Sequence, residues 1–260
     1  MKKTSLFAFV LWIGITVGFA SFGESVTVTY LGHSCFTIQL EDGPIIMIDP
    51  YASYVPYPAL PQPADIVLMT HAHVDHCPQS YGETDRSTGD PLEVFSWDNQ
   101  SRIQEGNWRI TDELLVRFIE ATHVTKTGSG QGYVGLFSFE VGGIRFAHLG
   151  DLGRILTSSQ ITALGDVDVL FIPVGGGPTI GAAEALTLIA QLPTVKIVFP
   201  MHYHVEDITP WPEIAPLSDF TLVADATVDV VDQETHQVVI DSNALPEDVE
   251  VWILEYFVPE

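Results

Sequence analysis

Residues 70–76 read Thr70-His71-Ala72-His73-Val74-Asp75-His76, so four side chains that can bind a metal ion lie within six positions. The apolar run 66–70 predicts a buried strand that ends directly before His71, and a strand end holds ligands rigidly. In a tight loop, His71 and His73 can face one ion while Asp75 and His76 reach a second. Imidazole and carboxylate donors suit Zn, Mn or Fe. The alternative is a histidine-rich surface loop, which is the weaker interpretation because so dense a pattern rarely follows a core strand without a ligand role.

Hydrophobic patterning on both sides of this segment predicts strands first and then strands alternating with helices. The residues at 26, 28 and 30 are apolar or aromatic and alternate with threonines, which is the pattern of a half-buried strand. We expect strands at 26–31, 35–40, 44–49, 66–70, 115–121, 134–141, 144–148, 167–174, 196–200, 236–241 and 249–256, and helices at 160–164, 182–191 and 217–224. Residues 78–113 are polar and predict loops with short strands. The alternation in the second half indicates helices packed on a sheet.

Three more motifs follow in the chain: Ala121-Thr122-His123, His148-Leu149-Gly150-Asp151 and Pro200-Met201-His202-Tyr203. Together with the first segment, in this order, they resemble the metallo-β-lactamase superfamily, over about residues 25–205. The resemblance implies an α/β (α+β) fold, a four-layer αββα sandwich with metals at one edge of its two sheets.

The resemblance also implies a site for two divalent ions, with zinc expected and manganese or iron as alternatives. It assigns the first ion to His71, His73 and His123, the second ion to Asp75, His76 and His202, and a bridging role to Asp151. Asp75 and Asp151 are the expected catalytic carboxylates, because Asp75 can orient the nucleophile as well as bind metal.

Four further residues are expected beside the ligands or in the pocket: His148, Asp49, His33 and His204. His148 is an alternative ligand because it lies near Asp151, but the family takes the upstream histidine, His123. Asp49 ends a strand and is expected to orient a ligand histidine, with a turn-capping carboxylate as the alternative. His33 and His204 are about equally well explained as structural histidines.

The motifs Gly32-His33-Ser34-Cys35-Phe36, Ile48-Asp49-Pro50 and Pro173-Val174-Gly175-Gly176 are similar to the branch that contains ascorbate-6-phosphate lactonase. This resemblance implies hydrolysis of a small ester, lactone or phosphoester by a hydroxide that two metal ions share. Aspartate rather than cysteine at the bridging position 151 disfavours β-lactam hydrolysis. The alternative function is that of a non-catalytic exported metal-binding protein.

The charge balance is strongly acidic, with 34 Asp plus Glu against 10 Lys plus Arg and a formal net charge of −24 among 260 residues. Nucleic-acid binding rests mainly on contacts between basic side chains and phosphate. The composition therefore argues against a nucleic-acid partner and for a small-molecule substrate.

The N-terminus has the pattern of an export signal: Lys2 and Lys3 precede an apolar run from Leu6 to Ala20. The run is short for a membrane span, which needs about 20 residues. We expect residues 1–20 to be a signal peptide, with the cleavage site as late as Gly23, and residues 24–260 to form a single exported domain. An uncleaved membrane anchor is the alternative. For Cys35 and Cys77 we expect buried thiols, with a disulfide as the alternative.

Overall fold

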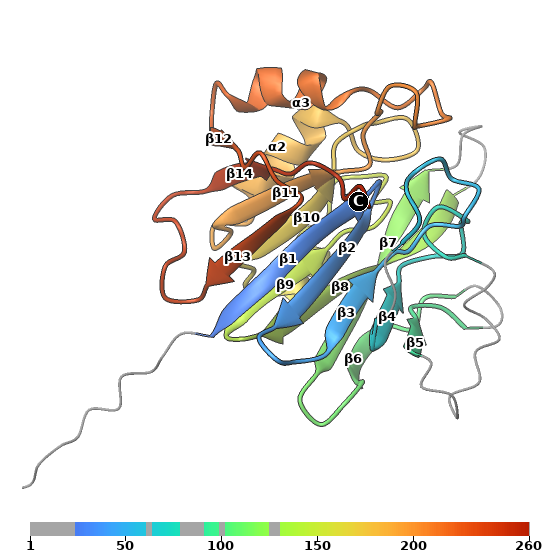
Figure 1. The fold of residues 1–260 in the computed structure, drawn as a ribbon, viewed down its shortest axis with the longest axis vertical. Helices are drawn as coiled ribbons and strands as arrows, with labels where there is room; N and C mark the ends of the chain where they lie inside the picture. The colour runs from blue at the N-terminus through green and yellow to red at the C-terminus, as the bar shows by residue number, and fades with distance from the viewer. Residues whose placement is uncertain (1–23, 61–63, 79–90, 99–101, 125–130, 260) are drawn as a thin grey trace, which may run out of the picture.

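The computed structural model describes residues 24–60, 64–78, 91–98, 102–124 and 131–259, which form two β-sheets and three helices (Figure 1). The first sheet has six strands in the order β13-β1-β2-β3-β4-β5, and the second has eight in the order β12-β14-β11-β10-β9-β8-β7-β6. The predicted signal peptide lies outside the described residues.

The first sheet consists of β1 (Ser25–Gly32), β2 (Cys35–Leu40), β3 (Ile45–Ile48), β4 (Ile66–Met69), β5 (Leu92–Phe95) and β13 (Gln237–Asp241). The strands β13, β1, β2 and β3 pair antiparallel, whereas β3, β4 and β5 pair parallel. Parallel pairing brings the carboxyl ends of β3 and β4 to the same edge, so that Asp49 and His71 leave the sheet side by side.

The second sheet consists of β6 (Gly106–Arg109), β7 (Leu115–Val124), β8 (Gln131–Val141), β9 (Ile144–His148), β10 (Val169–Pro173), β11 (Ile197–Met201), β12 (Asp229–Asp232) and β14 (Glu250–Ile253). The strands β6 to β9 pair antiparallel, and β9, β10, β11, β14 and β12 pair parallel. The loops after β9 and β11 therefore leave from one edge of this sheet.

The helices are α1 (Ser158–Leu164), α2 (Ala182–Ala190) and α3 (Leu217–Ala224). Thr157 caps α1, because its side chain accepts a hydrogen bond from the amide of Gln160. Each helix buries at least one large apolar side chain, such as Leu188 of α2 and Phe220 of α3, in the same core as the strands. Among the described residues, no helix is long and apolar enough to cross a membrane.

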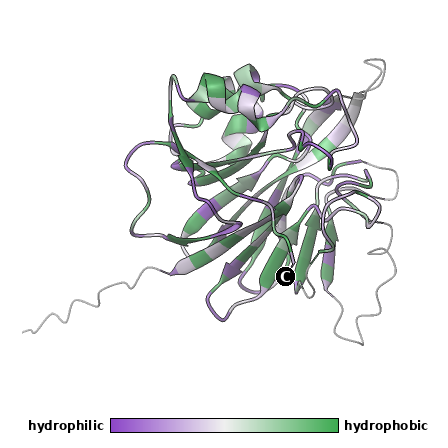
Figure 2. Cartoon of the chain, turned by 45° about the horizontal axis from the view of Figure 1, so that its top comes forward, coloured by the Kyte–Doolittle hydropathy of each residue, from purple (hydrophilic) through white to green (hydrophobic). Residues whose placement is uncertain are grey.

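Strand β4 is apolar throughout because both of its faces are buried. Its residues Ile66 and Leu68 belong to the large core, while Val67 and Met69 belong to a second cluster on the opposite face of the first sheet. Figure 2 shows the central strands coloured as hydrophobic. Burial on both faces removes the polar alternation of a one-sided strand and makes β4 a rigid base for the loop that follows it.

The predicted fold class, mixed α/β with two sheets, is confirmed. The αββα expectation places helices on the outer face of each sheet. On the outer face of the first sheet, in the described part of the chain, Tyr51, Val55 and Tyr57 of an irregular segment pack instead. Prolines in that segment, such as Pro56 and Pro58, disfavour a helix.

Two other expectations about strands and cysteines need correction. The last strand ends at Ile253 rather than at residue 256, and the sequence did not predict the edge strand β12, because it has only four residues and an aspartate at each end. Both cysteines are free thiols, and Cys35 is buried as expected while Cys77 is only partly buried.

Candidate metal centre

The seven residues that the sequence predicted as metal ligands come together at one edge of the two sheets. They lie at the end of β7 and in the loops that follow β4, β9 and β11. In parallel sheets, the carboxyl ends of neighbouring strands are where ligand-binding loops gather. Two sets of donors result: His71, His73, His123 and Asp151 in the first set, and His33, Asp75, His76 and His202 in the second set, each with donor atoms within 4.8 Å of one another.

In the first set, ring nitrogens lie within hydrogen-bond distance of one another. The Nε2 atom of His71 lies 3.1 Å from Nδ1 of His73, and Nε2 of His123 lies 3.2 Å from the same Nδ1 atom. The carboxylate of Asp151 lies 3.5 Å from His71 and 3.8 Å from His123. His73 is exposed, whereas the other three side chains are buried.

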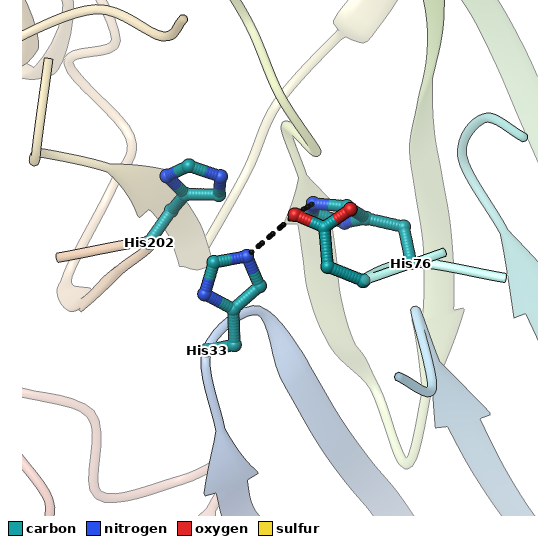
Figure 3. Close-up of side chains that lie close together, drawn as sticks. His33, His76 and His202 are labelled. Carbon is teal, nitrogen blue, oxygen red and sulfur yellow. Dashed lines mark hydrogen bonds and ion pairs between the residues drawn. The ribbon is translucent and has the colours of Figure 1, made fainter. Parts of the chain in front are cut away.

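The second set surrounds the other oxygen of Asp151. Its Oδ1 atom lies 2.9 Å from Nε2 of His76 and 3.2 Å from Nε2 of His202. The carboxylate of Asp75 lies 3.8 Å from the same nitrogen of His76. Figure 3 shows the imidazoles of His33, His76 and His202 facing a common point. Asp151 therefore contacts both sets, one with each carboxylate oxygen.

Hydrogen bonds on the far side of three imidazoles fix which nitrogen faces the centre. The Nδ1 atom of His76 donates to Asp49, 2.8 Å away, and Nδ1 of His123 donates to the main-chain carbonyl of Asp151, 3.1 Å away. The hydroxyl of Thr70 donates to Asp49 and so accepts from Nδ1 of His71, 3.0 Å away. In each ring this network fixes Nε2 as the nitrogen that faces the centre, which is the orientation that a metal ligand requires.

Asp49 is the hub of that network. Its carboxylate is fully buried and accepts hydrogen bonds from the Thr70 amide at 2.8 Å, from the Thr70 hydroxyl at 2.6 Å and from His76. Burial alone would raise the pKa of Asp49, but the neighbouring His76 outweighs it and the pKa lies below its ordinary value. An ionised Asp49 thus holds ligands of both sets in place.

The electrostatics of the site require a cation. Burial raises the pKa of the Asp151 carboxyl, but His202, His76 and His71 more than compensate, so that its pKa is well below the usual range. Burial opposes protonation of His76, but Asp151, Asp75 and Asp49 raise its pKa well above the ordinary value. Three buried or partly buried carboxylates therefore stabilise a positive charge at Nε2 of His76, and they would stabilise a metal ion at the same place.

Three other histidines of the centre have lowered pKa values. Burial lowers the pKa of His123 to about 4 and that of His33 to about 4. Loss of solvent around its ring also lowers the pKa of His73. Neutral imidazole is the form that coordinates metal, so these three rings are in that form at neutral pH.

Three residues at this edge have a strained backbone. Of the six described non-glycine residues with positive φ, these three are His33 at 55°, Asp49 at 48° and His202 at 53°. Such values cost energy for residues with a Cβ atom and persist where the surroundings impose them, which is common at functional sites. The strain aims these three side chains at one place.

The three histidines that were expected beside the ligands or in the pocket differ in their positions and contacts. His148 accepts from the Gly150 amide at 3.2 Å and donates to the Ser34 carbonyl at 3.0 Å, so its ring is fully occupied in shaping the loop that carries Asp151. His33 lies within the second set, closer to the centre than the sequence suggested. His204 faces Glu206 at 3.7 Å and is in neither set.

One supporting residue, Thr70, was not singled out from the sequence. It connects Asp49 to His71 through its hydroxyl, and it is fully buried. Its position directly before the first histidine was the only available signal.

The donor set fits a pair of divalent ions. Nε2 of His76 and Oδ1 of Asp151 are buried and lie 2.9 Å apart as an ion pair, with no other hydrogen-bond partner within the described part of the chain. Buried polar atoms need partners, and a divalent ion bound by both atoms would supply one to each. Histidine and carboxylate ligands in this mixture suit Zn, Mn or Fe.

Comparison with known proteins identifies the family. Residues 27–202 match the family model described as the beta-lactamase superfamily domain. A UPF0173 metal-dependent hydrolase of Thermococcus onnurineus is 30% identical over 210 residues, which are 73% of this chain and 88% of the relative. The chain belongs to the UPF0173 metal-dependent hydrolases of this superfamily. A second member, from Carboxydothermus hydrogenoformans, is 29% identical over 203 residues, covering 72% of this chain and 87% of the relative.

Solved structures agree with this family assignment. A metallo-beta-lactamase superfamily protein from Thermotoga maritima superimposes with a TM-score of 0.62 at 28% identity, covering 89% of this chain and all of that protein. Igni18, a metallo hydrolase from Ignicoccus hospitalis, has a TM-score of 0.61 at 22% identity, covering 84% of this chain and 99% of that one, and shows the fold alone. The chain is thus a metal-dependent hydrolase of the metallo-β-lactamase superfamily with a clustered His/Asp site.

Proposed function

We propose that this protein is a hydrolase with two divalent ions, and that its substrate is a small, uncharged carboxylic ester or lactone. The observation that supports a two-ion site is the carboxylate of Asp151, because one oxygen lies beside His71 and His123 and the other beside His76 and His202. A carboxylate shared in this way is suited to bridge two ions.

Bound ions would lower the pKa of a water molecule toward neutrality and polarise the scissile bond. The first set, His71, His73, His123 and Asp151, would hold one ion, and Asp75, His76 and His202 would hold the other together with the second oxygen of Asp151. Asp75 is 13% exposed and ionised, because His76 and His33 outweigh the effect of burial on its pKa. It can therefore accept a hydrogen bond from the attacking water and orient it.

Zinc is the proposed metal. The Thermotoga maritima structure carries a description as a Zn-dependent hydrolase, and three histidines with one carboxylate form a common zinc set. Manganese and iron are the alternatives for the same donors.

The preference for an uncharged substrate rests on charge and on an aromatic neighbour. The formal net charge of −24 repels anions, which disfavours a phosphoester. Beside the second set, the partly buried Trp211 lies with its ring centroid 5.3 Å from that of His33, and such a ring can provide apolar contact area. A lactone or carboxylic ester also agrees with the branch that the sequence motifs resemble.

The test is to load the protein with Zn²⁺ or Mn²⁺ and to measure turnover on a panel of aryl esters, aliphatic lactones and phosphodiesters. We expect two ions per chain, turnover of esters or lactones, and a loss of about 100-fold or more in Asp151→Ala, since even residues that only orient ligands contribute about 10–100-fold. Two bound ions without turnover of any member would favour a non-catalytic metal-binding protein. Full activity in Asp151→Ala would contradict the bridged site.

We also propose that the enzyme is exported. The support is the basic and then apolar pattern of residues 1–20. Expression of the full chain in a bacterium should give a periplasmic protein whose mass corresponds to cleavage between residues 20 and 23. A protein that keeps its N-terminus and sediments with membranes would indicate an anchor instead.

A further inference from the structure

The side chain of His33 belongs to none of the motifs that supply the predicted ligands. It lies at the turn between β1 and β2, is fully buried, and has a φ of 55°. The left-handed conformation is unfavourable for a residue with a Cβ atom, so the surroundings must hold it there. In Figure 3, the ring of His33 lies between the hairpin below it and the other two labelled imidazoles.

His33 makes specific contacts with two ligands of the second set. Its Nε2 atom donates a hydrogen bond to Oδ2 of Asp75, 3.2 Å away (Figure 3). Its main-chain carbonyl accepts a hydrogen bond from the amide of His202, 2.9 Å away, and the two imidazole centroids are 4.3 Å apart. One residue thus connects a loop of the first sheet to the end of β11 in the second sheet.

The rest of the turn fixes His33 in this place. The hydroxyl of Tyr30 donates to the His33 carbonyl at 3.1 Å. The ring of Tyr57 lies where a side chain at Gly32 would stand, since a Cβ atom there would be 2.3 Å from it. With both sides of the turn occupied, the imidazole can point only into the site.

The contact between His33 and Asp75 is a hydrogen bond in the structure, and its 3.2 Å separation lies within the range for such bonds. It restrains Oδ2 of Asp75, and this restraint needs no bound ion.

We propose that His33 is a positioning residue for the second metal ion, which sets Asp75 by a side-chain hydrogen bond and His202 by a main-chain hydrogen bond. This inference rests on the proposed two-ion function. It assigns a role to the first hairpin of the fold, because the hairpin aligns ligands from both sheets before any ion arrives. Such pre-alignment raises affinity without adding a ligand.

The test uses Co²⁺ alone as the probe, followed by calorimetry and by the visible absorption of the bound ion. The variants are His33→Phe, which keeps a planar ring but has no donor, and His33→Gln, whose amide N–H can reach the place of Nε2–H. His202→Ala identifies the binding step that belongs to the second set. His236→Phe is the control, since the ring of His236 contacts Phe257 and belongs to neither set.

We expect two binding steps in the wild-type protein and in His236→Phe. His33→Phe should weaken the step that His202→Ala abolishes by about 10–100-fold and leave the other step unchanged, and His33→Gln should restore most of the loss. If His33→Phe binds both ions as the wild type does, the inference is wrong while the proposed function stands. If His33→Gln loses the step as completely as His33→Phe and its spectrum changes, His33 is a ligand and the positioning role is wrong. If the wild type binds fewer than two ions, both proposals fail.

Discussion

The two donor sets differ in how open they are to solvent. In the first set, His73 is exposed, so the set has an open side. In the second set, His33, His76 and His202 are 0%, 0% and 1% exposed. Both sets combine donors of the loop after β4 with donors from two other elements, so both depend on the packing of the two sheets. We expect the first to be the side on which substrate enters.

The largest expected difference between the two sets is in the ions that remain bound when one ligand residue is replaced. In His202→Ala, the second ion should be lost and the first retained, because His202 contacts only the Oδ1 side of Asp151. In His123→Ala, both ions should weaken, because Nδ1 of His123 also holds the main-chain carbonyl of Asp151. In each variant, we expect kcat/KM to fall by about 100-fold or more, beyond the range for residues that only orient ligands.

Metal content by elemental analysis and Co²⁺ titration measure this difference. Loss of the first ion in His202→Ala with the second retained would reverse the assignment of the sets. Equal behaviour of the two variants would mean that the bridge through Asp151 couples the sets so tightly that they act as one.

The positions of the donors along the chain explain how much of the site could be predicted from the sequence. The segment from His71 to His76 places its donors within one loop, and the run before it has the composition of a buried strand, so the strand and this cluster could be predicted together. The distant residues His123, Asp151 and His202 could be proposed only because their motifs resembled those of a known family. Strands such as β2 and β9 were predicted with correct bounds because periodicity is a local signal.

The parts that sequence reasoning missed are those that depend on tertiary contacts. Nothing near His33 in the chain indicates that its ring meets Asp75, because that contact joins residues 42 positions apart. Thr70 was overlooked because its hydroxyl acts only after Asp49 has been brought beside it by the pairing of β3 with β4. Edge strand β12 lacks an apolar face and pairs only with β14, so its formation depends on the sheet.

Asp49→Asn should have a smaller effect. It tests whether one carboxylate orients ligands of both sets. Asp49 holds His76 directly and His71 through Thr70, so both binding steps should weaken, by about 10–100-fold. Asp65→Asn is a matched control, because Asp65 accepts from the amide of Ile45 before the other end of β4 and is exposed. Calorimetric titration should show no change in the control. A change in only one step of Asp49→Asn would show that the hub serves a single set.

The smallest expected effect is the change with pH in the stability of the metal-free protein. The carboxylates around His76 raise its pKa despite burial, so the folded metal-free chain holds a proton there that the unfolded chain releases at about pH 6.5. This contribution to stability is complete below pH 6.5 and is lost as the pH rises through the folded-state pKa. Histidines with lowered pKa, such as His123, are neutral in the folded chain, whereas in the unfolded chain they are about half protonated at pH 6.5, so their opposite contribution to the slope fades by about pH 7.5.

We therefore expect the melting temperature of metal-free protein to fall by a few degrees, on the order of 1 kcal/mol, between about pH 7.5 and pH 8.5. The metal-loaded protein should not show this fall, because an ion replaces the proton at His76 and binds better as protons become scarce. Calorimetric melting of both forms over this range measures the difference, which should widen with pH. If the melting temperatures of the two forms change with pH in the same way, a metal ion does not replace the proton at His76, and His76 is not a ligand.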